Sequence, residues 1–310
     1  MITATTETSL KRRTADLERM VGNTPLHLVR GIFNKPGVTV YAKQEWQQLS
    51  GSVKCRAAYN IIRTAIDNDW LSGNKILLDA TSGNTGIAYA AICEKLGIPL
   101  TLCLPENASK ERKEILQSLK ANLVLTSRFE GTDGAQDTAR ELAEKFPQKY
   151  YYADQYKNEA NWKAHYYGTA MEIFQPLPGI THFVTGLGTT GTFVGTGRRL
   201  KELNPSIHLT ALHPDLPLHG LEGWKHLETA LVPGIYDPKV ADENLEISTE
   251  EAYEMIKAAA KYEGLLLSPS SAANLAGAIR VAEKLDQGTV VTMLPDNADK
   301  YSEVIKNLLG

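Results

Sequence analysis

Stretches with the two-residue period of β-strands alternate with stretches of helical period along almost the whole of this 310-residue chain. The strand-like runs cover residues 38–42, 76–79, 100–104, 123–126, 150–152, 182–185, 208–212 and 290–294. The helical patterns cover residues 53–66, 85–96, 108–122, 134–145, 158–174, 190–203, 249–262 and 270–285. Strands that alternate with helices of this length form βαβ units, so the pattern predicts an α/β fold with mostly parallel sheets and three-layer domains.

The charge and the cysteine content limit the partners and the compartment. The chain has 33 Lys and Arg against 36 Asp and Glu, a formal net charge of -3, so we expect no nucleic-acid partner. Its longest apolar stretch, residues 87–93, is shorter than the ~20 residues of a membrane helix, so we expect no membrane partner. Three cysteines without a CxxC pair or a secretory signal indicate a reducing compartment and a cytoplasmic protein.

The length of the chain and its first residues suggest how it is organised. A chain of this length usually divides into two domains. Residues 1–12 are rich in threonine and basic residues, and they lack the apolar core of a targeting sequence. We therefore expect residues 1–12 to form a flexible tail or a dimer arm.

Four strand-to-helix turns are rich in glycine and hydroxyl side chains. They comprise residues 50–54, 81–86, 186–192 and 268–271. Small side chains let backbone N–H groups approach an anion, and the helix dipole favours negative charge at that point. Several such turns in one chain indicate a ligand with more than one anionic group, bound where the parallel strands end.

The turn at 186–192 contains a G-x-G-x-x-G spacing, which is also that of the dinucleotide-binding fingerprint. That fingerprint requires an acidic residue about 20 residues later, at the end of the next strand. Here the next strand ends at His213, and Asp215 lies only nearby. A single phosphate is therefore the favoured ligand of this turn, and an NAD(P) oxidoreductase is an alternative of a different class.

Lys54 lies in the first turn of an expected helix, where the helix dipole disfavours its positive charge. A neutral amine is the nucleophile that forms a Schiff base, so this position favours covalent chemistry on a carbonyl group. The hydroxyl and amide side chains at 81–85 suit a carboxylate, although the same residue types also cap helices. The seven histidines have no zinc-ligand spacing, so we expect no metal site and interpret them as loop or core residues.

Six short motifs follow one another along the chain: GNTPL at 22–26, KxE at 43–45, GSVK at 51–54, TSGNTG at 81–86, GLGTTGT at 186–192 and LPD at 294–296. With this set the sequence resembles the cysteine synthase family of fold-type II pyridoxal-phosphate enzymes, a fold like that of tryptophan synthase β. Within that family it most resembles the branch that uses O-phosphoserine. The resemblance implies a large domain of residues 13–50 and 157–310 and a small mobile domain of residues 51–156. It also implies pyridoxal 5'-phosphate bound between the domains, usually in a homodimer.

The resemblance further implies roles for individual residues. Lys54 would form the Schiff base with the cofactor, Asn84 would touch its ring hydroxyl, and Ser270 would face its pyridine nitrogen. The cofactor phosphate would be held by Gly188, Thr189, Thr190, Gly191 and Thr192. The substrate carboxylate would be bound by Thr81, Ser82, Thr85 and Gln155, and the phosphate of O-phosphoserine would be met by Lys225.

By the same resemblance, the activity is a β-replacement on an activated L-serine, either O-phosphoserine or O-acetylserine. A sulfur nucleophile would add to an α-aminoacrylate and give L-cysteine, with sulfide or a sulfur-carrier protein as the source. Other reactions of the same cofactor stay open, namely a cystathionine or diaminopropionate-type synthase and a serine or threonine dehydratase. A cofactor-free binding protein is the last alternative.

Overall fold

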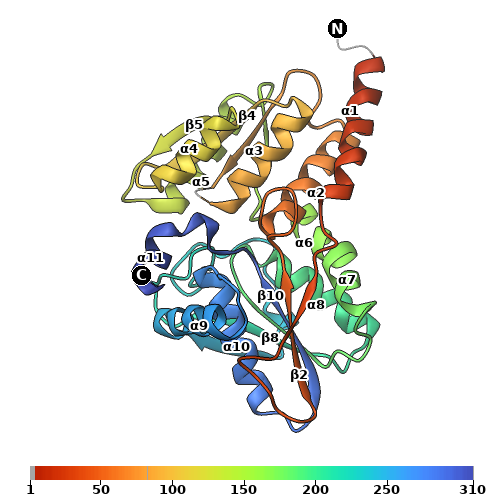
Figure 1. The fold of residues 1–310 in the computed structure, drawn as a ribbon. Helices are drawn as coiled ribbons and strands as arrows, with labels where there is room; N and C mark the ends of the chain where they lie inside the picture. Colours follow the sequence, from red (N-terminus) through yellow and green to blue (C-terminus); the bar gives the residue numbers. More distant parts are fainter. Residues whose placement is uncertain (1–3, 82, 310) are drawn as a thin grey trace. The chain divides into compact units, whose positions relative to one another are not determined.

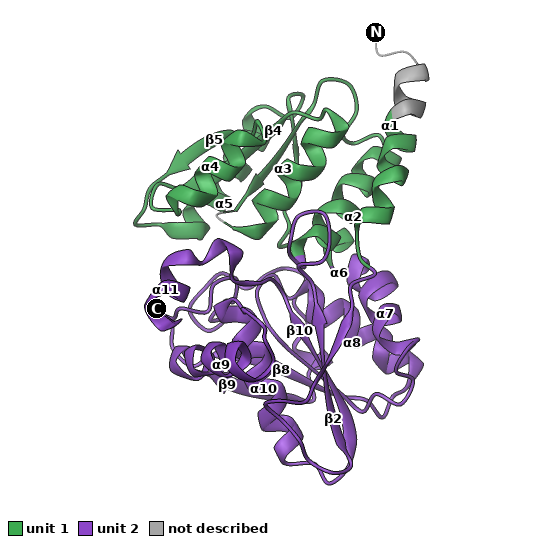
Figure 2. Cartoon of the chain, viewed as in Figure 1, with its two compact units in different colours: residues 1–22, 54–161 green, residues 23–53, 162–310 purple. Residues whose placement is uncertain are grey.

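The computed structural model describes residues 4–81 and 83–309, which form two compact units (Figures 1 and 2). The first unit contains the described part of residues 1–22 together with residues 54–161. The second contains residues 23–53 and the described part of residues 162–310. No helix in the described residues is both long and apolar enough to cross a membrane.

The first unit is built on a four-stranded parallel sheet with the strand order β5-β4-β3-β6. Its strands are β3 (Ile76–Ala80), β4 (Leu100–Pro105), β5 (Asn122–Thr126) and β6 (Tyr150–Tyr152). Its helices are α1 (Ala4–Leu17), α2 (Lys54–Asp67), α3 (Asn84–Leu96), α4 (Lys110–Ser118) and α5 (Gly131–Lys145). Strand β4 is buried along its whole length, as expected for an apolar strand that helices cover on both faces.

The second unit is built on a six-stranded sheet with the order β1-β2-β10-β7-β8-β9. Its strands are β1 (Leu26–Val29), β2 (Val38–Gln44), β7 (His182–Gly186), β8 (His208–Pro214), β9 (Glu243–Ile247) and β10 (Gly288–Leu294). Its helices are α7 (Ala170–Phe174), α8 (Gly191–Leu203), α9 (Thr249–Tyr262), α10 (Pro269–Glu283) and α11 (Ser302–Leu309). Strand β1 runs antiparallel to β2, and the other neighbouring strands are parallel. Helix α10 is buried on nearly every side, which explains its many alanines.

The α/β fold with mostly parallel sheets that the sequence pattern predicts is confirmed, and each predicted strand lies within two residues of its expected bounds. The pattern does not predict β1 and β9, because both are edge strands composed largely of half-buried and exposed side chains. The single helix expected over residues 158–174 is interrupted. A π-helical turn, His165–Thr169, lies between α6 (Glu159–Ala164) and α7.

The N-terminal residues differ from the flexible tail expected over residues 1–12. From Ala4 onward the structure describes helix α1, and residues 1–3 lie outside the described residues. Arg13 Nη2 donates a hydrogen bond to Lys95 O at 2.6 Å, and the Tyr59 hydroxyl donates to Thr14 O at 3.1 Å. These bonds join α1 to α3 and α2, so the chain up to residue 22 belongs to the first unit and not to the larger one.

A buried ion pair holds the end of β2, the strand that leads towards Lys54. Lys43 is fully buried, and its Nζ lies 2.8 Å from Glu172 Oε2 and donates to Thr24 O at 2.7 Å. Thr24 Oγ1 in turn donates to Glu45 Oε1 at 2.6 Å. A charge in the interior depends on such partners, because an uncompensated buried charge is strongly destabilising.

We expect Lys43→Met to lower the free energy of unfolding of the second unit by about 3 kcal/mol, because it removes the cation that faces Glu172. Lys284→Met is the matched control. Lys284 Nζ lies 3.6 Å from Glu243 Oε1, but its side chain is 62% exposed. The control should therefore change stability by less than about 0.5 kcal/mol. Urea unfolding measures both variants, and equal midpoints would contradict a structural role for the Lys43 pair.

Candidate active site

Lys54 is the first residue of α2 and is half-buried. The first turn of this helix carries no acidic residue that would offset the positive end of the helix dipole. The preceding turn, in the second unit, is held by Val53 N, which donates to Pro295 O at 2.8 Å, and by Lys300 Nζ, which donates to Gly51 O at 3.0 Å. The backbone that leads into Lys54 is therefore fixed by hydrogen bonds on both sides of the turn.

The side chains predicted to bind a substrate carboxylate gather near the start of α3 in the first unit. Thr81, Thr85 and Gln155 are all buried. Thr85 Oγ1 donates to Gln155 Oε1 at 2.7 Å, although 70 residues of sequence separate the two. Gln155 Nε2 donates to Ala80 O at 3.1 Å, so the orientation of its amide is set by the strand end.

Asn84 is the first residue of α3, and Gly83 is its N-cap. The first N–H groups of a helix lack intrahelical acceptors and, with the dipole, favour an anion. Ser82, another predicted member of this group, lies outside the described residues. The structure thus brings Thr85 and Gln155 into contact at a helix end suited to a carboxylate.

Asp79, which the sequence motifs do not single out, is hydrogen-bonded to this group. Its side chain is fully buried, Oδ1 accepts from Ala80 N at 2.8 Å, and Oδ2 accepts from Gln155 N at 3.4 Å. Burial disfavours the charged carboxylate and raises the pKa of Asp79 to about 7. The signal in the sequence is one acidic residue inside an otherwise apolar strand.

The glycine-rich turn at 186–192 connects β7 to α8 in the second unit. Thr190 is the N-cap of α8, with φ at 70°, and its buried Oγ1 has no hydrogen-bond partner among the described residues. A Cβ atom at Gly188 would lie 2.1 Å from Gly223 O, so the two backbones approach too closely for any side chain. An unsatisfied hydroxyl beside the first N–H groups of a helix fits a phosphate group.

The segment that carries Lys225 is attached to the glycine-rich turn. Lys225 N donates to Leu187 O at 2.8 Å. The Trp224 ring fills the space beside Gly186, where a Cβ atom would lie 2.0 Å from Trp224 Cε2. Lys225 Nζ lies 3.5 Å from Leu231 O. Backbone contacts therefore place residue 225 next to the turn whatever its side chain.

Ser270 lies in the first turn of α10 and is buried. Its Oγ is 3.3 Å from the Oγ of the N-cap residue Ser268, which accepts from Ser271 N at 3.2 Å. One turn later in the same helix, Asn274 Oδ1 accepts from Gly186 N at 2.6 Å. Helix α10 thus links Ser270 to the start of the glycine-rich turn.

The predicted site residues divide between the two units. The first unit contains Lys54, Thr81, Asn84, Thr85 and Gln155. The second unit contains Gly188, Thr189, Thr190, Gly191, Thr192, Lys225 and Ser270.

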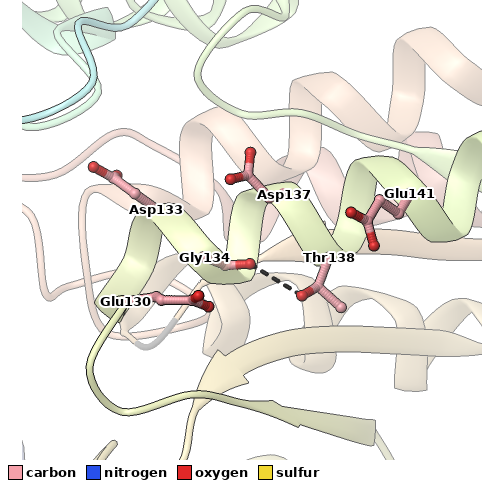
Figure 3. Close-up of a pocket in the computed structure, with 6 residues that line it drawn as sticks. All are labelled: Glu130, Asp133, Gly134, Asp137, Thr138 and Glu141. Carbon is pink, nitrogen blue, oxygen red and sulfur yellow. Dashed lines mark hydrogen bonds between the residues drawn. The ribbon is translucent and has the colours of Figure 1, made fainter.

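A separate pocket on α5 contains none of these residues (Figure 3). Its lining residues are Glu130, Asp133, Gly134, Asp137, Thr138 and Glu141. Thr138 Oγ1 donates to Gly134 O at 3.0 Å, and Asp137 forms an ion pair with Arg140. Throughout the described chain, no group of three or more histidine, cysteine or acidic side chains is arranged to hold a metal ion. The acidic pocket therefore adds nothing to the candidate site.

Comparison with known proteins links the two sets of residues to one family. The family described as "Pyridoxal-phosphate dependent enzyme" matches residues 17–296. A cysteine synthase from Aquifex aeolicus (strain VF5) is 44% identical over 291 residues, which are 91% of this chain and 89% of that protein. An O-acetylserine dependent cystathionine beta-synthase from Bacillus subtilis (strain 168) is 36% identical over 293 residues, covering 92% and 95% of the two chains.

The solved structures agree with the sequence relatives. A crystal structure of cysteine synthase from Entamoeba histolytica matches with a TM-score of 0.88 and 30% identity. The match covers 94% of this chain and 90% of that chain. The similarity therefore includes the residues of both units.

We expect Asp79 to make stability depend on pH. Its carboxyl group has a pKa of about 7 in the folded protein against an ordinary value of 3.8, so between these values the folded state holds a proton that the unfolded state has released. The free energy of unfolding of the first unit therefore falls as the pH rises through this window, by at most about 1.4 kcal/mol per pH unit. Asp79 causes no further loss above the folded pKa.

Asp79→Asn removes this titration. Raising the pH from about 5 to about 7 should destabilise the native protein by about 2 kcal/mol more than the variant, as measured by urea unfolding at both pH values. Asp286→Asn, at an exposed residue, is the control and should keep the native pH dependence. An unchanged pH dependence in Asp79→Asn would show that this carboxyl group does not titrate in the window.

Proposed function

The chain belongs to the family of pyridoxal-phosphate dependent enzymes and is of the cysteine synthase type, and we propose that it uses O-phosphoserine as its activated serine. Its relatives support a β-replacement, in which a nucleophile takes the place of the β-substituent of a serine derivative. The observation that carries the choice of O-phosphoserine is the attachment of the Lys225 segment to the glycine-rich turn. A cation there would compensate the desolvation of a leaving phosphate.

The two sets of residues fit pyridoxal phosphate, which, when bound, supplies an electron sink for negative charge at the substrate Cα. We propose that the N–H groups and hydroxyls of residues 188–192 bind its phosphate. Lys54 would hold the cofactor covalently through its amine, with the carbonyl oxygen lost as water, and Asn84 would hold its ring hydroxyl. The Ser270 hydroxyl would face the ring nitrogen. A hydroxyl, unlike a carboxylate, does not favour protonation of that nitrogen, so prompt loss of the β-substituent is favoured over transamination.

The residues of the first unit then bind the amino acid and move its proton. In this function the substrate carboxylate binds at the start of α3, with Thr81, Ser82, Thr85 and Gln155 as its ligands. Thr85 and Gln155 are already in contact, so less ordering is needed when the substrate binds. Once the substrate amine has replaced Lys54 on the cofactor, the released Lys54 amine would take the proton from Cα, and the helix dipole favours its neutral form.

The second candidate substrate is O-acetylserine, on which the Bacillus relative depends by its name. The same cofactor also serves the synthesis of cystathionine or diaminopropionate and the elimination reactions of serine or threonine. Analysis of the products formed from each substrate would reveal these reactions. The glycine spacing alone also allowed an NAD(P) oxidoreductase. We do not adopt that alternative, because the family that matches this chain uses pyridoxal phosphate.

We propose a homodimer that works in the cytoplasm, with sulfide or a sulfur-carrier protein as the sulfur source. Cys55, Cys93 and Cys103 are buried and form no disulfide within the described part of the chain, which agrees with a reducing compartment. Light scattering tests the dimer, and product analysis with each sulfur donor tests the source.

We expect Lys225→Ala to lower kcat/KM for O-phosphoserine by ~10–100-fold, the loss of about 1.5–3 kcal/mol that removal of a charge-assisted hydrogen bond brings. Turnover of O-acetylserine should change little, because an acetyl group needs no cation. Lys225→Arg should keep most of the activity, and Lys239→Ala, at an exposed residue of the same unit, should keep all of it. Steady-state kinetics with both substrates decides. Equal losses for the two substrates, or no loss with O-phosphoserine, would overturn the choice of substrate.

Lys54→Ala should lower turnover by about 10³-fold or more, because it removes both the covalent attachment and the base at Cα. Mass spectrometry after borohydride treatment should find the reduced cofactor on the native peptide that contains Lys54, and not on the variant. The Lys110→Ala protein is a control, since the Lys110 side chain, in the same unit as Lys54, is 90% exposed. A fully active Lys54→Ala enzyme would contradict the assignment.

A further inference from the structure

A buried histidine lies next to the glycine-rich turn and contacts a hydroxyl of the predicted phosphate site. His165 Nε2 lies 3.3 Å from Thr192 Oγ1, in the first turn of α8. His165 Nδ1 lies 2.9 Å from Thr169 Oγ1. His165 is only 2% exposed and Thr169 is fully buried. The two threonines and the imidazole ring thus form a hydrogen-bonded row that ends at the turn.

The backbone of the π-helical turn fixes the positions of His165 and Thr169 in this row. His165 and Thr169 begin and end the π-helical turn, in which Ala170 N donates to His165 O. This turn and the end of α6 before it pack tightly against α8, because a Cβ atom at Gly195 would lie 2.0 Å from Trp162 O and 2.9 Å from His165 Cβ. The backbone at His165 is therefore held close to α8. Single π-helical turns inside helices are frequent at functional sites.

The protonation of the imidazole decides what the Thr192 hydroxyl can do. A neutral imidazole has one N–H donor and one acceptor nitrogen. If Nε2 carries the hydrogen, it donates to Thr192 Oγ1, Thr169 donates to Nδ1, and the Thr192 hydrogen can point at an anion. If Nδ1 carries the hydrogen, Thr192 must donate to Nε2, and its hydrogen cannot reach the anion.

We propose that His165 is a positioning residue of the phosphate site, oriented by its contact with Thr169 Oγ1, and that it carries its hydrogen on Nε2, so that the Thr192 hydroxyl hydrogen is directed at the bound phosphate. This inference rests on the proposed function, because it takes the turn at 188–192 as the phosphate ligand. It adds that selectivity for the phosphate group depends on a buried hydrogen-bonded row outside that turn.

The first experiment titrates the full-length protein, stripped of its cofactor, with pyridoxal phosphate and with pyridoxal, and follows the absorbance of the complex. His165→Met removes the donor and should weaken pyridoxal phosphate binding about 10-fold while it changes pyridoxal binding less than about 2-fold. His165→Gln keeps an N–H donor on a side chain of similar length and should restore most of the affinity. Equal weakening of both ligands would show a structural role only and would overturn the proposal.

A double-mutant cycle tests whether His165 acts through Thr192. In a Thr192→Val background, His165→Met should cause little further loss of pyridoxal phosphate affinity, because the hydroxyl that it positions is already absent. If the two losses add fully, His165 does not act through Thr192 and the proposal is overturned.

Thr169→Val preserves the shape of the side chain and provides a second test if the His165 variants do not fold. It should weaken pyridoxal phosphate binding about 2–5-fold, and native affinity for both ligands would count against the proposal.

The tautomer itself is read by ¹⁵N NMR of labelled histidine, with inorganic phosphate as the probe. His165 should carry its hydrogen on Nε2 when phosphate is bound, and Thr169→Val should lower that population. A hydrogen on Nδ1 in the phosphate complex would overturn the proposal. These outcomes are distinct from failure of the proposed function, in which the native protein would bind no pyridoxal phosphate at all.

Discussion

The contact between the backbones at Gly188 and Gly223 is the constraint on which the second unit's site depends. No side chain fits at Gly188, where a Cβ atom would lie 2.1 Å from Gly223 O, so the turn at 186–192 stays close to the segment that carries Lys225. Gly223 itself has a φ of 92°, a backbone conformation that favours glycine. The Trp224 ring packs against Gly186 and adds a second close contact between the same two segments. One steric requirement thus determines how closely the glycine-rich turn lies to the segment that carries Lys225.

Polar groups in the interior give each set of site residues its shape. Asp79 fixes the backbone of Gln155 in the first unit, and Asn274 fixes the start of the glycine-rich turn in the second. Each group loses hydration on burial, so it stabilises the fold only through the hydrogen bonds it makes. A buried hydrogen bond also fixes the orientation of its partner group, whereas a hydrogen bond exposed to water leaves the partner group able to turn.

Local patterns in the sequence predict much of the fold and part of the site, for physical reasons. The buried strands β3, β4 and β10 were predictable from their apolar runs, and the glycine-rich turn from its spacing and its place between a strand and a helix. His165 gave no such signal. It was one of seven histidines without a ligand spacing, and its contact with Thr192 exists only because two helices pack closely. The π-helical turn that contains His165 could not be predicted either, because a search for the 3.6-residue period of an α-helix does not detect it.

The alternation of the two units along the chain also has a consequence for synthesis on the ribosome. The first unit is complete once residue 161 has emerged, so its sheet can close while the rest of the chain is still being made. Strand β2 must wait longer for its parallel partner, because that partner is β10, residues 288–294. Until then β2 can pair only with β1, and an isolated hairpin is marginally stable in water. The nascent protein therefore carries an unpaired edge of β2 until residues 288–294 have been made, and the central sheet of the second unit closes later than the sheet of the first.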